Sequence, residues 1–286
     1  MEKKKKRSEY NNTQSYDDEL DIVYELLDDC RLAEKDILNQ LEAYLERLVE
    51  LIETRFPFYF PRGMINKAGY LRMAEDLLMH RGHSDISQLL DRMRADVTRL
   101  QSEKIMALMI LDYETTAQKT AQSIGVPSVV RTPEIIRETV LKPWCEDRLT
   151  FLDRIKKNTE DMDSRLRQVI LKGIRGGWSI KQMAEELRKV TGMAAYKAQR
   201  LIRTETMAVY SKVTKEIYLE NGIEYIEIIG DAACGGICLD YVGEYLPLAE
   251  AEVGIDLPPY HPNCACSFCS YMDFGDVRVE GEEIEE

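Results

Sequence analysis

Long apolar runs are missing from this sequence. No stretch approaches the roughly 18 residues that a membrane span needs, so we expect none. The basic N-terminus is followed by no apolar segment, so we expect no secretory signal there. The seven cysteines are odd in number and unevenly spaced, which is not the pattern of a disulfide scaffold. Reduced thiols, either buried or bound to metal, are the expectation.

A positive net charge is also missing. Lys and Arg total 38 against 51 Asp and Glu, which gives a formal net charge of −13. Because phosphates repel an acidic surface, we do not expect the whole chain to coat nucleic acid. The balance is uneven, however, since residues 165–216 hold twelve Lys or Arg and four Glu. This basic segment contains the candidate contacts to a nucleic-acid backbone, namely Lys172, Arg175, Lys181, Arg188, Lys189, Lys197 and Arg200.

Apolar residues recur at helical spacing through most of the chain. Between 18 and 54 they lie three, four or seven apart, which predicts one long amphipathic helix. Ser84 is placed to cap a later helix, and Thr132-Pro133 to start another. The predicted helices cover about 18–54, 71–78, 86–121, 133–142 and 145–175, and two more share the range 180–221.

The basic segment predicts a helical hairpin. Ser179 and Gln182 have the spacing of a capping box. From there the pattern predicts a helix, a turn at Thr191-Gly192 and a long helix that stops at Gly222. Two helices joined by a short turn resemble a DNA-binding helix-turn-helix. Any helical hairpin gives the same pattern, so sequence-specific and non-specific DNA contact both stay open.

The stretch from Cys234 to Cys269 has a different chemistry from the helices. It holds five of the seven cysteines and one of the three histidines. The β-prone residues 223–229 and 243–246 predict a small sheet. The expected fold class is therefore mainly α with a small α+β C-terminal domain. It comprises a long-helix N-terminal arm, a helical hairpin and a Cys/His-rich β cap.

Zinc is a candidate cofactor for this stretch. Structural zinc needs four soft or borderline ligands, usually offered as two close pairs. A small β unit with little core gains much stability from such a metal. The alternatives are cysteines that pack as small hydrophobes beside a histidine bonded to nearby backbone, or thiols that oxidise. The candidate ligands are Cys234 and Cys238 as the first pair, and His261, Cys264, Cys266 and Cys269 for the second.

Catalytic chemistry has less support in the same stretch. A zinc deaminase needs H-x-E followed by P-C-x-x-C, but position 263 is Asn and the pieces stand in the wrong order. A Cys–His nucleophile pair is conceivable in principle. Nothing else marks an oxyanion site or an orienting partner, so no catalytic residue is predicted and we expect no enzyme.

Several motifs, taken in order, resemble the Mu F-like phage minor head protein family. They are Arg203-Thr204-Glu205 on a long helix, then Asp231 and Cys238 ahead of Gly243, and finally the segment PPYHPNCAC at 258–266. Their order and spacing together are specific, and the resemblance covers roughly residues 165–270. The family usually shows D-x-R-T-C-x-x-C, whereas this chain has one extra residue before Cys238.

The resemblance implies a structural, non-enzymatic minor capsid component. Such a protein associates with portal and capsid proteins during head assembly in the host cytoplasm. It then stays in the virion, in the capsid interior or at the portal vertex, where packaged DNA is a further candidate partner. Composition and helical spacing predict a disordered basic tail (1–17), a helical N-terminal domain (18–164) and a disordered acidic tail (271–286). The resemblance implies a head morphogenesis domain (165–270) between the last two.

Two alternatives from other classes stay open. One is a zinc-stapled protein that binds nucleic acid non-specifically outside any capsid. The other is a hydrolase or toxin-like enzyme that uses His261 and a cysteine. Arg203 and Glu205 are two apart on a helix and cannot share a face, so we expect one of them to bond to the β cap.

Overall fold

The computed structural model describes residues 13–59, 84–230 and 236–271. Helices dominate these residues, and a small antiparallel sheet follows them, which confirms the predicted fold class. The predicted helix at 71–78 and the candidate ligand Cys234 lie outside the described residues, as do most of both predicted tails. Residues 13–17, which the sequence predicts to belong to the disordered tail, are helical, because α1 begins at Thr13.

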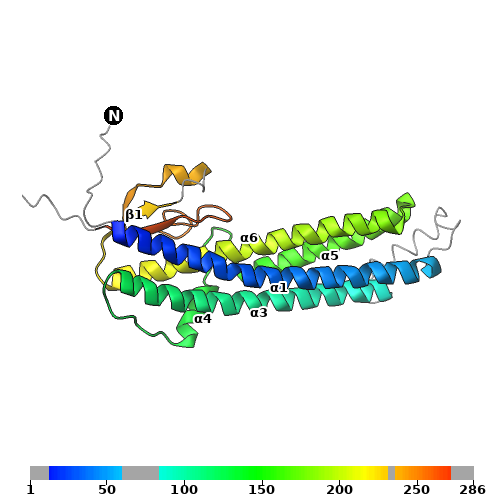
Figure 1. The fold of residues 1–286 in the computed structure, drawn as a ribbon, viewed down its shortest axis with the longest axis horizontal. Coiled ribbons are helices and arrows are strands. Elements are labelled where there is room, and N and C mark those ends of the chain that lie inside the picture. Colours follow the sequence, from blue (N-terminus) through cyan, green and yellow to red (C-terminus); the bar gives the residue numbers. More distant parts are fainter. Residues whose placement is uncertain (1–12, 60–83, 231–235, 272–286) are drawn as a thin grey trace, which may run out of the picture.

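Four long helices form a rod (Figure 1). Their apolar stripes meet in one continuous core, which residues of all four helices share. α3 and α6 lie at the centre of this packing, because each of them contacts all of the other three helices. Within the described residues, no helix is both long and apolar enough to cross a membrane. The four helices are α1 (Thr13–Tyr59), α3 (Asp85–Ser123), α5 (Phe151–Gly176) and α6 (Ile180–Glu220).

Several predicted helix ends are confirmed. Ser84 caps α3 through its side chain. Ser179 and Gln182 form the expected capping box at the start of α6. The short helix α4 (Pro133–Leu141) begins at the predicted proline. Local capping chemistry therefore decides these boundaries.

The predicted start of the helix near Cys145 is wrong. α5 begins at Phe151, because Thr150 and Asp153 form a capping box there. Arg148, just upstream, has a φ of 53°, which a helix does not accommodate. Residues 142–150 therefore form an irregular segment, here called the connector, between α4 and α5.

The turn predicted at Thr191-Gly192 is also wrong. α6 continues through both residues, so it holds no helix-turn-helix, and the hairpin turns instead at 177–179 between α5 and α6. A glycine inside a helix costs about 1 kcal/mol relative to alanine. Burial of Leu187, Val190 and Ala198 in the rod core offsets that cost.

The β cap, described at residues 225–230 and 236–271, lies beside one end of the rod (Figure 1). Its sheet has the order β2-β1-β3 with both pairs antiparallel. The pairing of the first two strands follows the sequence prediction, whereas the third strand carries no clear β pattern in the sequence. A small apolar core forms where Ile226, Ile228 and Phe268 pack on Tyr218 of α6. The strands are β1 (Tyr225–Ile229), β2 (Tyr245–Pro247) and β3 (Ser267–Tyr271).

Candidate metal centre

A tight turn positions one side of the candidate centre. The N–H of Cys264 donates to the carbonyl of His261 at 3.1 Å. Between them, Pro262 takes the second position and Asn263 the third, where φ is 63°. Proline at the second position and asparagine at a positive φ suit a β-turn of this kind. The sequence HPNC therefore folds the histidine and the cysteine toward the same point.

The other side comes from a short 3-10 helix, η2 (Gly236–Asp240). Its Cys238 is fully buried. The Cys238 Sγ lies 3.0 Å from Nε2 of His261 and 3.6 Å from Sγ of Cys264. The ligand atoms of these three residues all lie within 4.8 Å of one another. Residues that are 26 positions apart in the sequence thus form one donor cluster.

Cys266 joins the same cluster. It is buried against Cys238 and Cys264. Hydrogen bonds from Cys266, and then from Cys238, hold the pKa of the Cys264 thiol well below its usual range, although burial opposes them. A thiol that ionises easily is a good ligand for a soft metal. We call Cys238, His261, Cys264 and Cys266 the thiol cluster.

The imidazole has a defined orientation. Nδ1 of His261 lies 2.9 Å from the carbonyl oxygen of Pro262, so Nδ1 carries the proton and donates it. That tautomer leaves a lone pair on Nε2, which faces Cys238. A histidine ligand commonly has its second nitrogen fixed in this way.

The remaining predicted ligands lie elsewhere or outside the described residues. Cys269 is buried on β3, where its register partner is Glu227. Neither Cys269 nor Cys266 is part of the three-ligand group found among the described residues. Cys266, however, packs against Cys238 and Cys264, whereas Cys269 is not in that buried cluster. Cys234 precedes η2 and is not described. The structure therefore brings four of the six predicted ligands together.

The Arg203-Thr204-Glu205 motif sends its side chains in three directions. Arg203 donates to Glu34 of α1 at 2.8 Å. Thr204 Oγ1 accepts the N–H of Asn263 at 3.1 Å, so this residue is the one that contacts the β cap. Glu205 turns to the connector instead. The expectation that Arg203 or Glu205 bonds to the cap is wrong. Successive residues of a helix point in different directions, and at this position it is Thr204 that faces the cap.

Residues 164–269 match the family described as Phage Mu protein F like protein. This segment is a Mu F-like domain. The match confirms the family resemblance and supports a phage head-related protein. No curated protein and no solved structure matches the chain.

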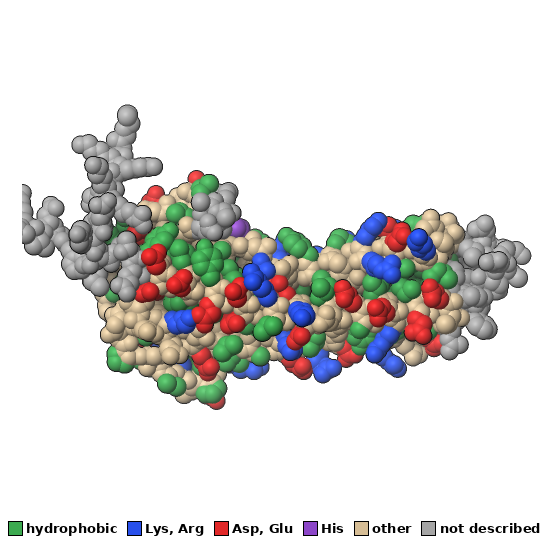
Figure 2. Space-filling view, in the orientation of Figure 1, with side chains coloured by type: hydrophobic (Ala, Val, Ile, Leu, Met, Phe, Trp, Pro, Cys, Tyr) green, Lys and Arg blue, Asp and Glu red, His purple; other side chains and the backbone are tan. Residues whose placement is uncertain are grey.

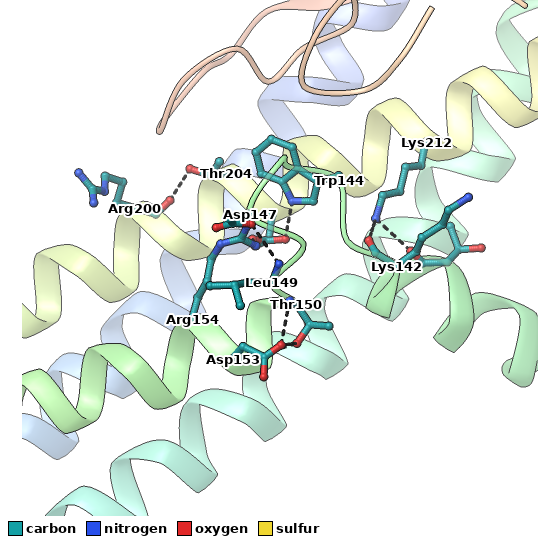
Figure 3. A network of polar contacts seen from close by, with 12 residues as sticks. Lys142, Trp144, Asp147, Leu149, Thr150, Asp153, Arg154, Arg200, Thr204 and Lys212 are labelled. Carbon is teal, nitrogen blue, oxygen red and sulfur yellow. Dashed lines mark hydrogen bonds and ion pairs between the residues drawn. The ribbon is translucent and has the colours of Figure 1, made fainter.

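The Mu F-like domain buries a carboxylate against the connector (Figure 3). Glu205 accepts from Trp144 Nε1 at 2.9 Å and from Arg154 Nη1 at 2.8 Å. Arg154 also bonds to Asp147 of the connector at 2.7 Å. Burial raises the pKa of Glu205, and the bonds from Trp144 and Arg154 oppose that rise. This network was not predicted from the sequence.

Lys212 ties the same helix to the end of α4. Its Nζ donates to the carbonyl oxygens of Thr139 and Lys142 at 3.1 and 2.5 Å. Burial lowers the pKa of Lys212 to about 8. Carbonyls at the end of a helix attract a cation, so Lys212 fixes the entry to the connector (Figure 3).

The predicted nucleic-acid contacts gather around the hairpin of the Mu F-like domain. Lys172, Arg175, Lys181 and Arg188 are exposed near the turn between α5 and α6. Lys189 is also exposed and forms an ion pair with Glu186, whereas Lys197 is half-buried and bonds to Asp161 at 2.6 Å. Arg200 is exposed beside the cleft that the connector forms with the cap. On the face shown in Figure 2, basic and acidic side chains are interspersed along the rod.

Proposed function

We propose that this chain is a structural minor head protein that associates with the portal during phage head assembly. The Mu F-like domain at 164–269 is the observation that carries the proposal. Portal and capsid proteins are the proposed partners, and the virion is the proposed final location, after assembly in the host cytoplasm.

The rod exposes several single apolar side chains at which contact with a protein partner can be tested. Leu32 and Leu38 are exposed on α1, with Leu32 at 72% exposure. Leu111 on α3 and Val130 before α4 are exposed as well, the latter at 94%. Single exposed apolar side chains are normal on a helix surface and do not by themselves form an interface, so these positions only choose where the proposal is tested.

Association with the portal can be tested by co-expression with the portal protein of the same phage. We expect affinity-tagged portal protein to retain the full chain, and Leu32→Glu with Leu38→Glu to weaken that retention. Asn39→Glu is the matched control, because it adds a negative charge to an exposed polar position of the same helix. Loss of retention in the control as well would contradict an apolar contact, and no retention of the parent chain would contradict the proposal.

Contact with packaged DNA is the second part of the proposal. The exposed cations near the α5–α6 turn are concentrated at the end of the rod farthest from the β cap (Figure 1). Backbone contacts of this kind are independent of sequence and weaken with salt. The net charge of −13 favours binding through this end over binding through the molecule as a whole.

Binding of the full chain to duplex DNA over a range of salt concentrations tests this contact. Neutralising the four turn cations to Gln is expected to weaken binding and to flatten its salt dependence. Neutralising four exposed cations of α1 and α3 is the matched control. An equal effect from both sets would contradict a defined DNA-binding end. The first set is Lys172, Arg175, Lys181 and Arg188, and the control set is Arg31, Lys35, Arg99 and Lys104.

The enzyme alternative draws on one observation, the 3.0 Å contact between Cys238 Sγ and Nε2 of His261. A thiol beside an imidazole is the arrangement of a nucleophile pair. Cys238 is fully buried, however, and a second thiol lies beside it. Rapid alkylation of Cys238 in the folded chain, suppressed by His261→Ala, would favour this alternative over the structural function.

A further inference from the structure

We propose that Cys238, His261, Cys264 and Cys266 bind one zinc ion in a closed, structural site. Zinc in structural sites has four protein ligands in a tetrahedron, and Cys₃His is one of the usual sets. The thiol cluster supplies this set from η2 and from the turn that precedes β3. The ligand atoms of Cys238, His261 and Cys264 all lie within 4.8 Å of one another, and Cys266 is buried beside them as the fourth ligand that we infer. The inference concerns the metal alone and does not depend on the proposed role in head assembly.

The separations within the cluster suit a tetrahedral ion. Two thiolates on zinc, each about 2.3 Å from the metal, lie about 3.8 Å apart. The Cys238 and Cys264 sulfurs are 3.6 Å apart. The Cys238–His261 contact, at 3.0 Å, has the length of a hydrogen bond. Zinc displaces the thiol proton that makes this bond, and the two atoms then separate to about 3.5 Å.

The cluster is closed on the side of the sheet. A Cβ added to Gly230 would lie 2.8 Å from the Cys266 sulfur and 3.0 Å from a methyl group of Val242. The glycine therefore leaves the room that the thiol occupies, and Val242 covers the same side. Three thiols with one imidazole select a soft metal over magnesium or calcium. A closed site of this composition stabilises a fold and offers no open position for catalysis.

The site also explains what holds the cap together and onto the rod. η2 joins the cluster through Cys238, and the 261–266 loop joins it through the other three ligands. Asn263 on that loop donates its N–H to Thr204 of α6. A metal bound at the thiol cluster thus fixes the loop that docks the cap onto α6. The two separate motifs of the Mu F-like domain meet at this point.

Metal analysis of the full chain, purified in reducing buffer without added metal, tests the site. We expect one zinc per chain in the parent protein and a loss of that zinc in Cys264→Ser and in Cys266→Ser. Cys269→Ser is the matched control, because Cys269 is an equally buried thiol of the cap outside the cluster. Retention of zinc by Cys269→Ser together with its loss from Cys266→Ser supports the ligand set.

Cobalt provides a second measurement that does not depend on the variants folding well. The parent chain, stripped by a chelator and reloaded with Co²⁺, is expected to show the visible bands of tetrahedral cobalt and the near-ultraviolet bands of cobalt–thiolate bonds. Absence of both zinc and cobalt from the parent chain overturns the proposal. Loss of metal from Cys234→Ser, with full retention by Cys266→Ser, overturns the assignment of the fourth ligand.

Discussion

The rod and the β cap are stabilised in different ways. In the rod, apolar stripes of four long helices meet along one continuous core, so no single contact dominates. In the cap, three short strands enclose a small apolar core, and the loops depend on a few directed contacts. Burial distributed over many residues tolerates single changes better than a small core does. We therefore expect the loss of one buried side chain to lower local stability more in the cap than in the rod.

The joint between the two regions is partly polar. Tyr210 and Tyr218 of α6 both donate to the buried carboxylate of Glu19 on α1, at 2.5 and 2.8 Å. Tyr210 also bonds to Ser267 of β3 at 2.5 Å, and both tyrosine rings contact Phe268. Burial raises the pKa of Glu19, and the tyrosine hydroxyls oppose that rise. One carboxylate therefore connects α1, α6 and, through Tyr210, the cap.

The largest expected effect tests whether the cap can separate from the rod. Phe268→Ala removes a fully buried ring from the joint, which costs about 3–5 kcal/mol. Hydrogen exchange should show faster exchange of β1 and β3 amides with unchanged protection in the rod. Tyr225→Ala, on the half-exposed start of β1, is the control and should change little. Equal loss of protection in both regions would mean that they unfold as one unit.

A second effect is confined to the rod and depends on pH. Asp112 on α3 is fully buried and accepts from Thr206 of α6 at 2.8 Å, while its Oδ1 has no partner among the described residues. Burial raises its pKa to about 7, and the bond from Thr206 opposes that rise. Because the folded state holds this proton more tightly, its contribution to stability is present at low pH. It is lost as the pH rises through about 4 to 7.

Asp112→Asn should abolish the fall in stability with rising pH, because an amide does not ionise and resembles the protonated acid. With a pKa raised from 3.8 to about 7 and about 1.4 kcal/mol per pKa unit, the variant should gain on the order of 4 kcal/mol over the parent at about pH 8 and little at about pH 4. Denaturant unfolding at several pH values measures the difference. Glu114→Gln, on the exposed side of the same helix, controls for the change in charge. A gain that is equal at all pH values would point to packing instead of titration.

The sequence predicts the rod better than the cap for a physical reason. Helical spacing and capping residues are local signals, so the main helices and several of their ends follow from the pattern. One error arises at Gly192, where packing in the rod keeps a helix intact although glycine disfavours it. Another arises at Thr150, whose capping box starts α5 later than the helical spacing predicts. In the cap, the choice among six candidate ligands depends on strand register. β3 places Cys269 opposite Glu227, and no spacing rule reveals that position.

A third, smaller effect tests the contact by which the cap docks onto α6. Thr204→Val keeps the shape of the side chain but leaves the N–H of Asn263 without its acceptor. The expected loss is about 1–2 kcal/mol, measured as faster exchange of amides in the 261–266 loop. Thr204→Ser keeps the hydroxyl and should restore protection. If the serine variant behaves like valine, packing of the methyl group and not the hydrogen bond holds the loop.

The smallest expected effect tests whether ion pairs between helices contribute to the stability of the rod. Lys104 of α3 bonds to Asp36 of α1 at 2.6 Å, and both side chains are nearly half exposed. An exposed pair of this kind contributes less than about 1 kcal/mol, because water and salt screen it. A double-mutant cycle with Lys104→Ala and Asp36→Ala, followed by denaturant unfolding at low and high salt, isolates the coupling. A coupling well above that limit would show that the contact between α1 and α3 depends on charge. Stability of the rod would then rest on particular contacts, as it does in the cap.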